Sequence, residues 1–271
     1  MSEILEKLKW FWKTDDEKIS IVRDVIVAVA VVLAVLFFLW AYTGQWFTAP
    51  MVAIESGSME HPDDSPFGRY GTIDAGDMVL VVKVDSFDDV TPQGGPYGGP
   101  IARQDSSYFL YKDYGDVIIY KPLGDDSRSQ IIHRAMCWVQ VEIIGGTRHY
   151  TIEEYGIYND TQLTIPELGL NKRKPEWDHD GYLTKGDNNA VIDQVSSICP
   201  QPVKVEWVTG KARLEIPWLG TINLFFEDLM SGKNTIGNVH SDSLICLGIV
   251  LALLISIPVG LDLRDYIRKK K

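Results

Sequence analysis

Hydrophobic and polar positions divide the chain into two long apolar runs and a middle part with a strand-like pattern. No charged residue occurs between residues 25 and 54, and this run opens with the continuously apolar VIVAVAVVLAVLFFLWAY. About 20 apolar residues cross a bilayer core as a helix, and Gly44 and Pro50 then break helical continuity. The pattern predicts a transmembrane helix at residues 23–43. The aromatic belt expected on its far side consists of Trp40, Tyr42 and Trp46.

The second apolar run, SLICLGIVLALLISIPVGL, covers residues 243–261 and is also long enough to span a bilayer. The basic tail at residues 262–271 follows, and a basic segment beside a span marks the cytoplasmic side. We therefore predict two spans, with both termini in the cytoplasm and residues 44–242 outside. A cleaved signal peptide is the alternative for the first run, but such peptides have a shorter apolar core followed closely by a cleavage site.

Residues 1–22 predict a short amphipathic helix on the inner leaflet, with a solvated segment as the alternative. Its apolar residues recur at helical spacing with lysines between them, and they are Ile4, Leu8, Phe11 and Trp12. Thr14 and Glu17 match a capping box, which predicts that the membrane helix starts afresh there.

The middle part, residues 44–242, predicts a mainly β domain built of small antiparallel sheets or a barrel. Its runs rich in β-branched and aromatic residues are 77–84, 116–122, 130–144 and 149–155. Gly145-Gly146 predicts a turn between the last two runs. Residues 202–217 predict a further hairpin that turns at Thr209-Gly210-Lys211, and residues 224–230 a short helix. The predicted fold is a β domain outside the membrane, tethered by an N-terminal and a C-terminal transmembrane helix.

Charge narrows the classes of function. The formal net charge is −11, and residues 44–242 carry 16 Lys and Arg against 29 Asp and Glu. Nucleic-acid binding requires basic patches, so this acidic domain argues against it.

Cysteine and histidine give no metal pattern. The three cysteines have neither a disulfide framework nor metal-ligand spacing, and we interpret them as free thiols, with pairing of Cys137 and Cys199 left open. We expect no metal and no cofactor. The histidines in polar stretches are interpreted as surface residues, and they are His61, His149, His179 and His240.

Three short segments supply the parts of a serine hydrolase, which needs a nucleophile, a base, an orienting carboxylate and oxyanion donors. Ser58 follows the strand-like MVAIE and a Ser-Gly pair. His133 lies in the apolar QIIHRAMCWV, and histidine is the natural base near neutral pH. Asp187 lies in a Gly-Asp-Asn-Asn turn, and Asp193 follows six residues later. Each has an ordinary alternative: a loop serine, a packed core histidine and a turn-forming aspartate.

The order of these motifs resembles the signal peptidase I family. The motifs are SGSME, GDMVLV, GDVIIY, IIHR and TKGDNN with a later Asp, and WVTGKARLEIPWLG resembles the segment that follows in archaeal members. The resemblance is strongest to the archaeal and endoplasmic-reticulum branch, in which histidine is the base, whereas the bacterial branch uses lysine. It covers about residues 25–260. It implies a membrane-bound serine endopeptidase that removes signal peptides from exported proteins and cuts after small residues.

The resemblance also implies roles for single residues. The catalytic residues implied are the nucleophile Ser58, the general base His133, the triad acid Asp193 and a supporting acid, Asp187. The oxyanion donors implied are the backbone N–H of Ser58 and the hydroxyl of Ser56. Side chains near these positions are expected to shape the substrate site, and they are Ile54, Met59, Ile131 and Ile132.

Signal peptides of secreted preproteins and membrane lipid are the implied partners, and the protein-export channel is left open as a third. The implied location is the plasma membrane, in an archaeon.

Two features depart from the family pattern. His61 precedes Pro62, with about 14 further residues before Gly76-Asp77, and the loop at 91–107 is long. The path of the chain after Ser58 is therefore left open. The polar loop at 167–181, like that at 91–107, is interpreted as an insertion at the surface.

Other classes of function remain as alternatives. A non-catalytic, membrane-anchored β domain that binds ligands or builds the envelope predicts that Ser58, His133 and Asp193 lie far apart. An inactive family member predicts the three close together. A serine–lysine peptidase would use Lys112 or Lys121 as its base, and a cysteine transpeptidase would use Cys137.

Overall fold

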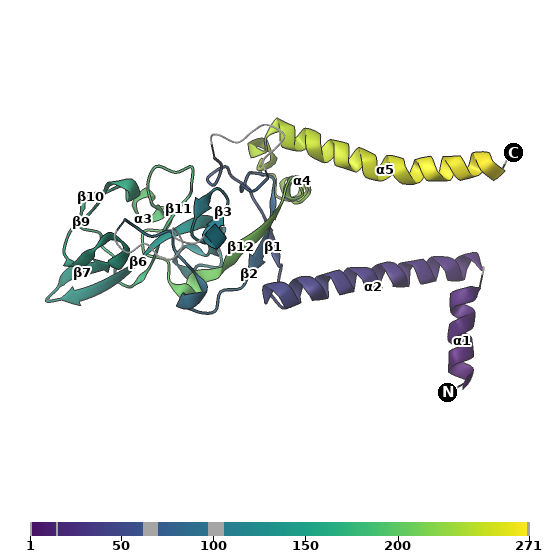
Figure 1. Cartoon of the computed structure of the whole chain (residues 1–271), viewed down its shortest axis with the longest axis horizontal. Coiled ribbons are helices and arrows are strands. Elements are labelled where there is room, and N and C mark those ends of the chain that lie inside the picture. Colours follow the sequence, from purple (N-terminus) through teal and green to yellow (C-terminus); the bar gives the residue numbers. More distant parts are fainter. Residues whose placement is uncertain (1, 15, 62–69, 97–105, 270–271) are drawn as a thin grey trace. The chain divides into compact units, whose positions relative to one another are not determined.

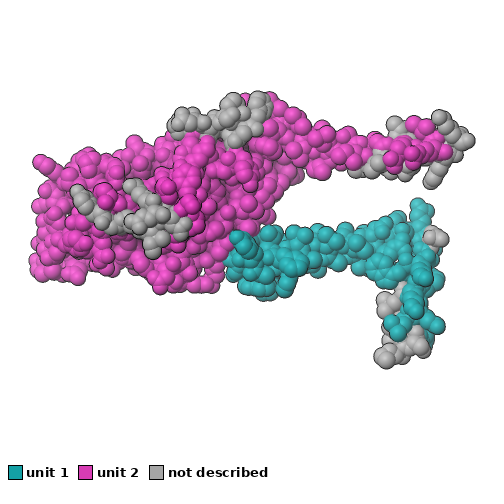
Figure 2. All heavy atoms as spheres, in the orientation of Figure 1, with its two compact units in different colours: residues 1–50 teal, residues 51–271 magenta. Residues whose placement is uncertain are grey.

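The computed structural model describes residues 2–14, 16–61, 70–96 and 106–269. The chain divides into two compact units, Met1–Pro50 and Met51–Lys271 (Figure 2). Most of the predicted loop at 91–107, and most of the insertion after His61 that begins with Pro62, lie outside the described residues.

The first unit consists of two helices, α1 (Ser2–Lys13) and α2 (Glu17–Thr43). The predicted N-terminal helix is confirmed by α1, but the predicted capping box is wrong. The side chain of Asp16 caps α2, because its Oδ1 accepts hydrogen bonds from the backbone N–H of Lys18 at 3.0 Å and of Ile19 at 3.3 Å. Gly44 ends the helix with a positive φ of 69°, as glycine often does.

α2 indicates that the protein associates with a membrane. Among the described residues it is the one helix long and apolar enough to cross a bilayer. The second apolar run lies in α5 (Ser241–Lys269), whose apolar part within the described residues, Ser241–Ile257, is shorter. The second span therefore stays a prediction.

The second unit is mainly β, which confirms the predicted class (Figure 1). Its strands are β1 (Met51–Ala53), β2 (Met78–Val82), β3 (Phe109–Leu110), β4 (Asp113–Tyr114), β5 (Val117–Tyr120), β6 (Ile131–Ile144), β7 (Thr147–Ile152), β8 (Ile157–Asp160), β9 (Leu163–Ile165), β10 (Leu170–Arg173), β11 (Gly181–Lys185) and β12 (Val208–Ile216). The main sheet has the order β1-β2-β12-β5-β6-β7-β8, and β11 also pairs with β6. Its pairs are antiparallel. Two small sheets, β9 with β10 and β3 with β4, complete it. The end strands β1 and β8 do not pair with each other among the described residues, so the predicted barrel alternative is not found there.

Two turn predictions have different outcomes. Gly145-Gly146 does connect β6 to β7, and both glycines have positive φ. The hairpin predicted at 202–217 is wrong, because β12 is one strand that pairs with β2 on one side and β5 on the other. Gly210 lies where the register with β5 shifts, so this glycine marks an irregularity within a strand and not a turn.

Short helices follow the strands. The helix predicted at 224–230 is α4 (Gly220–Ser231), which packs against β1. α3 (Asp193–Ser196) is a single turn that begins at one of the candidate acids.

A buried cluster supports the segment that carries Ser58. Ile54 and Met59 stand on either side of the Ser56-Gly57-Ser58 turn, and they are 2% and 1% exposed. Both pack in a core cluster with Ile73 and Val79. Burying such a side chain stabilises a fold by about 1.5–3 kcal/mol, so these two residues fix the turn at both of its ends.

Candidate active site

The candidate base His133 lies on a strand that has a neighbouring strand on each side. β6 lies between β5 and β11, and its residue His133 stands opposite Ile118 of β5. Thr184 of β11 pairs with Ala135 of β6, two residues from His133. His133 is only 3% exposed. The pairing of β5, β6 and β11 therefore brings side chains of all three strands together below the surface, around His133.

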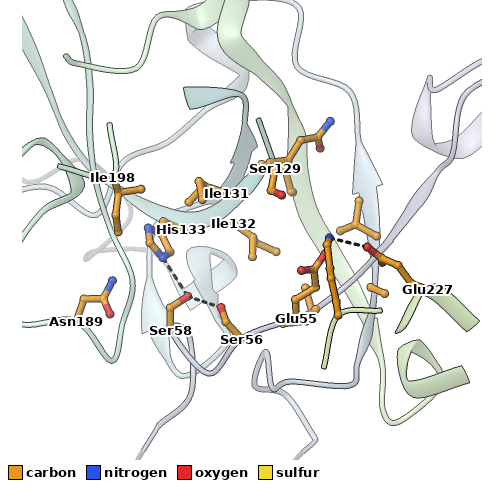
Figure 3. A pocket seen from close by; sticks show the side chains of 16 residues that line it. Glu55, Ser56, Ser58, Ser129, Ile131, Ile132, His133, Asn189, Ile198 and Glu227 are labelled. Atoms are coloured by element: carbon orange, nitrogen blue, oxygen red, sulfur yellow. Dashed lines mark hydrogen bonds and ion pairs between the residues drawn. The ribbon is translucent and has the colours of Figure 1, made fainter. Parts of the chain in front are cut away.

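Ser58 lies within hydrogen-bond distance of His133. The Ser58 Oγ is 3.0 Å from the His133 Nε2 (Figure 3). The turn that follows β11 holds Ser58 there, because the Asn188 N–H donates to the Ser58 carbonyl at 2.9 Å. Glycine is required at 186, since a Cβ there would stand 2.6 Å from the Ser58 carbonyl oxygen and 2.9 Å from the His133 Nε2. The Lys-Gly-Asp-Asn-Asn stretch thus lies directly against Ser58 and His133.

Asp193 orients the other side of the imidazole. Its Oδ2 lies 2.7 Å from the His133 Nδ1. The same oxygen accepts hydrogen bonds from the Tyr120 hydroxyl at 2.8 Å and the Thr184 hydroxyl at 2.7 Å. Burial raises the pKa of Tyr120, and the charge of Asp193 raises it further, so the phenol stays protonated and donates. With Nδ1–H directed at Asp193, Nε2 is left to accept the proton of Ser58.

The carboxylate of Asp187 bonds to Arg134 and His61. It pairs with Arg134, whose Nε lies 2.9 Å from Oδ1 and whose Nη2 lies 2.5 Å from Oδ2. Burial raises the pKa of the Asp187 carboxyl, but the hydrogen bonds and charges of Arg134 and His61 outweigh this and hold its pKa below the ordinary value. The His61 Nε2 lies 3.1 Å from Oδ2, so the interpretation of His61 as a plain surface residue is wrong.

The oxyanion and substrate positions implied by the resemblance, except Met59, lie along one cleft of about 520 Å³ (Figure 3). The Ser56 Oγ is 3.4 Å from the Ser58 Oγ, which places both hydroxyls at the same end. Ile54, Ile131 and Ile132 line the cleft. Met59 is not part of its lining, because this side chain is buried in the core below the turn.

Glu227 of α4 lies at the other end of the cleft, where its carboxylate pairs with Lys233 at 2.9 Å. The cleft therefore runs from the serine and histidine, past isoleucine side chains, to a charged end.

The residues of the alternative mechanisms lie elsewhere. Lys121 pairs with Asp126, and neither Lys121 nor Lys112 lines the cleft. Cys137 is fully buried, and burial raises the pKa of its thiol. Cys137 and Cys199 are free, buried thiols, as interpreted from the sequence. Ser58, His133 and Asp193 lie in contact, whereas a non-catalytic domain predicts them far apart.

Four functional positions were missed. Arg134 and Asn188 stand inside the motifs IIHR and TKGDNN, so their place beside His133 and Asp187 was a signal that could have been used. Tyr120 and Thr184 carry no local signal, because the sheet register alone brings them to Asp193.

The arrangement can perform nucleophilic catalysis. A buried acid, an imidazole and a serine hydroxyl form one hydrogen-bonded chain at the end of a cleft. In the described part of the chain, no group of three or more His, Cys, Asp or Glu could hold a metal ion. Neither a protein-family model nor a curated protein matches this chain.

Proposed function

We propose that this protein is a membrane-bound serine endopeptidase of the signal peptidase I type, in the branch that uses histidine as its base. Its substrates are the signal peptides of exported preproteins. The observation that supports this most strongly is the Ser58–His133–Asp193 chain, with distances of 3.0 and 2.7 Å between successive groups. The order of the motifs around these residues supports the choice of this family over other serine hydrolases.

The mechanism follows from the order of the hydrogen bonds. The His133 Nε2 removes the proton of Ser58 as Oγ attacks the carbonyl carbon of the scissile bond. Asp193 stabilises the imidazolium that forms, while the Ser58 N–H and the Ser56 hydroxyl donate to the oxyanion. His133 then gives its proton to the leaving amine, and the peptide bond breaks to leave an acyl-enzyme. Water attacks the ester, with His133 again as the base, and releases Ser58.

The cleft suits an extended peptide. β1 is an end strand that pairs with β2 alone in the described sheet, so its other edge has no strand partner there. A substrate strand added along β1 makes backbone hydrogen bonds and reaches Ser58 just beyond the end of that strand. Alternate side chains of a strand point to the same face. The residue before the cut and the residue two positions earlier therefore face Ile54, Ile131 and Ile132.

Peptide specificity tests this proposal. With a leader peptide that ends in Ala, changing that Ala to Leu or Phe is expected to block cleavage, because a bulky side chain clashes with the isoleucines. The substrate residue between these two cleft-facing positions faces away from the cleft, so a bulky side chain is tolerated there. Purified protein in detergent and a peptide panel, read by mass spectrometry, measure this. Equal turnover of peptides with Ala and with Phe before the cut contradicts the proposed specificity.

The proposed location is the plasma membrane, with the β domain outside and membrane lipid as a partner. α4 supports a place near the bilayer, because it packs on β1 and exposes a large apolar face. The exposed side chains of this face are Phe225, Phe226, Leu229 and Met230. Residues 44–50 connect α2 to β1, and seven residues reach at most about 25 Å. This short connection supports the proposal that the peptidase acts on chains at a membrane.

Topology can be tested with single cysteines. Tyr158 is 67% exposed in the β domain, and Arg268 is exposed near the end of α5. In a background with Cys246→Ser, an impermeant maleimide added to intact cells is expected to label Tyr158→Cys but not Arg268→Cys. Cys137 and Cys199 are buried and stay unlabelled. Labelling of both positions after lysis is the control, and labelling of Arg268→Cys in intact cells overturns the two-span proposal.

A further inference from the structure

Of three consecutive residues just before α5, the first and the third contact the segment that carries Ser58. We call Asn238, Val239 and His240 the C-terminal strap. The Asn238 Nδ2 donates to the Glu55 carbonyl at 2.8 Å, on one side of the Ser56-Gly57-Ser58 turn. The His240 Nε2 lies 3.1 Å from the Glu60 Oε1, on the other side. The strap therefore spans the turn, and its two polar contacts lie before and after Ser58.

Val239 anchors the middle of the strap. It is 8% exposed, and a Cβ added to Gly76 would stand 2.9 Å from its Cγ1. Gly76 itself is bonded to the strand before Ser58, because its N–H donates to the Ile54 carbonyl at 2.9 Å. The strap is thus packed against the same framework that holds the nucleophile segment.

Glu60 links His240 to the turn, because it contacts both His240 and Gly57. Its carboxylate fills the space beside Gly57, since a Cβ at that position would stand 2.7 Å from the Glu60 carboxyl group. The Glu60 N–H also donates to the Gly57 carbonyl at 3.2 Å, and the Glu60 Oε1 accepts from the Ala75 N–H at 3.4 Å. Fixing the Glu60 carboxylate therefore fixes the residue next to Ser58.

The strap is separate from the other support of the turn. Asn188 holds the Ser58 and Gly57 carbonyls from the opposite segment, at 2.9 and 3.0 Å. No strap residue lines the cleft. The strap is therefore not placed to contact a substrate in the cleft, and it acts through its contacts with Glu55 and Glu60 on either side of the turn.

We infer that Asn238 and His240 are positioning residues, which hold the Ser58 hydroxyl in line with His133 and couple that alignment to the place where α5 begins. This inference rests on the proposed peptidase function and extends it to the C-terminal segment. The physical reason is that displacing a reacting group by about 1 Å can lower a rate by about 100-fold. Ile54 and Met59 anchor the ends of the turn, and the strap and Asn188 hold the groups between them, so loss of a strap contact lets the Oγ move relative to Nε2.

The test compares kcat and KM for a leader peptide in full-length variants. Asn238→Ala and His240→Ala are each expected to lower kcat by about tenfold while KM stays within about twofold, because neither substituted side chain lines the cleft. His240→Gln is expected to recover most of the kcat, since its amide N–H can replace the donor to Glu60. Asn234→Ala, in the same exposed segment but outside the strap, is the matched control and keeps the wild-type values.

The outcomes separate this inference from the proposed function. If wild type cleaves, Ser58→Ala does not, and both strap variants keep wild-type kcat, the strap inference is wrong while the peptidase proposal stands. If wild type cleaves no leader peptide, the peptidase proposal itself fails. If His240→Gln loses as much kcat as His240→Ala, the positioning role is overturned. The same holds if KM rises by as much as kcat falls. Should His240→Ala fail to fold by near-ultraviolet circular dichroism, Asn238→Ala decides.

Discussion

Replacing Ser58 with alanine is expected to abolish cleavage of a leader peptide, and replacing His133 with alanine is expected to do the same. Ser58 supplies the attacking oxygen, and His133 is the group within hydrogen-bond distance that can accept its proton. Serine hydrolases typically lose about 10⁶-fold in kcat when either residue is removed. Because the two act as one unit, the double variant is expected to be hardly worse than either single variant.

The measurement is kcat for purified, folded variants, with Ser129→Ala as a matched control, because Ser129 also lines the cleft but has no place in the hydrogen-bonded chain. His133→Lys is expected not to rescue activity, since lysine has an ordinary pKa of about 10.4 and serves as a base only after a strong lowering of that pKa. Wild-type turnover by Ser58→Ala would show that the assignment of the nucleophile is wrong.

Local motifs predicted the parts of the site that lie within a few residues of one another. Ser56 and Ser58, and likewise Asp187 and Asn188, stand in short turns whose composition already suggests their geometry. His133 was found as a candidate base in a mainly apolar segment. What no motif supplied was the set of donors to Asp193, because Tyr120 and Thr184 reach it only through the register of β5 and β11 with β6.

The errors at His61 and at Thr209-Gly210-Lys211 have the same physical origin. The partner of His61 is 126 residues away in Asp187, so nothing near His61 in the sequence distinguishes it from a solvated residue. His240 likewise meets Glu60 from the other end of the chain. Thr209-Gly210-Lys211 has turn-like composition, but pairing on both sides keeps β12 extended through it. Tertiary pairing overrides local preference in each case.

Asp193 and Asp187 are expected to differ sharply when each is changed to asparagine. Asp193→Asn keeps the shape but removes the charge that faces the His133 Nδ1. The oxygen that accepts three hydrogen bonds then belongs to an amide, and the imidazole loses the group that sets its tautomer. In the serine protease that serves as the reference case, the equivalent change lowers kcat by about 10⁴-fold without altering the geometry. A loss of similar size is expected here, with little change in thermal midpoint.

Asp187→Asn is expected to act mainly on stability. It leaves the fully buried Arg134 guanidinium without its carboxylate, and breaking a buried ion pair costs about 3 kcal/mol or more. Asp178→Asn is the matched control, because Asp178 pairs with Arg148 at the surface, where such pairs contribute about 0–1 kcal/mol. Thermal midpoints and kcat of the three variants decide the roles. A larger loss of kcat in folded Asp187→Asn than in Asp193→Asn would exchange them.

The pH dependence of stability gives a second reading of Asp187. Its pKa is held below the ordinary value of 3.8, so the native state binds this proton less readily than the unfolded state. The stability that the ionised carboxylate contributes is therefore present above pH 3.8 and is lost as the pH falls through the native pKa. Asparagine does not titrate. The difference in thermal midpoint between wild type and Asp187→Asn is accordingly expected to be largest near neutral pH and to shrink on acidification below about pH 4. A difference that stays constant over that range would mean that the carboxylate charge contributes nothing to holding Arg134 beside the candidate site.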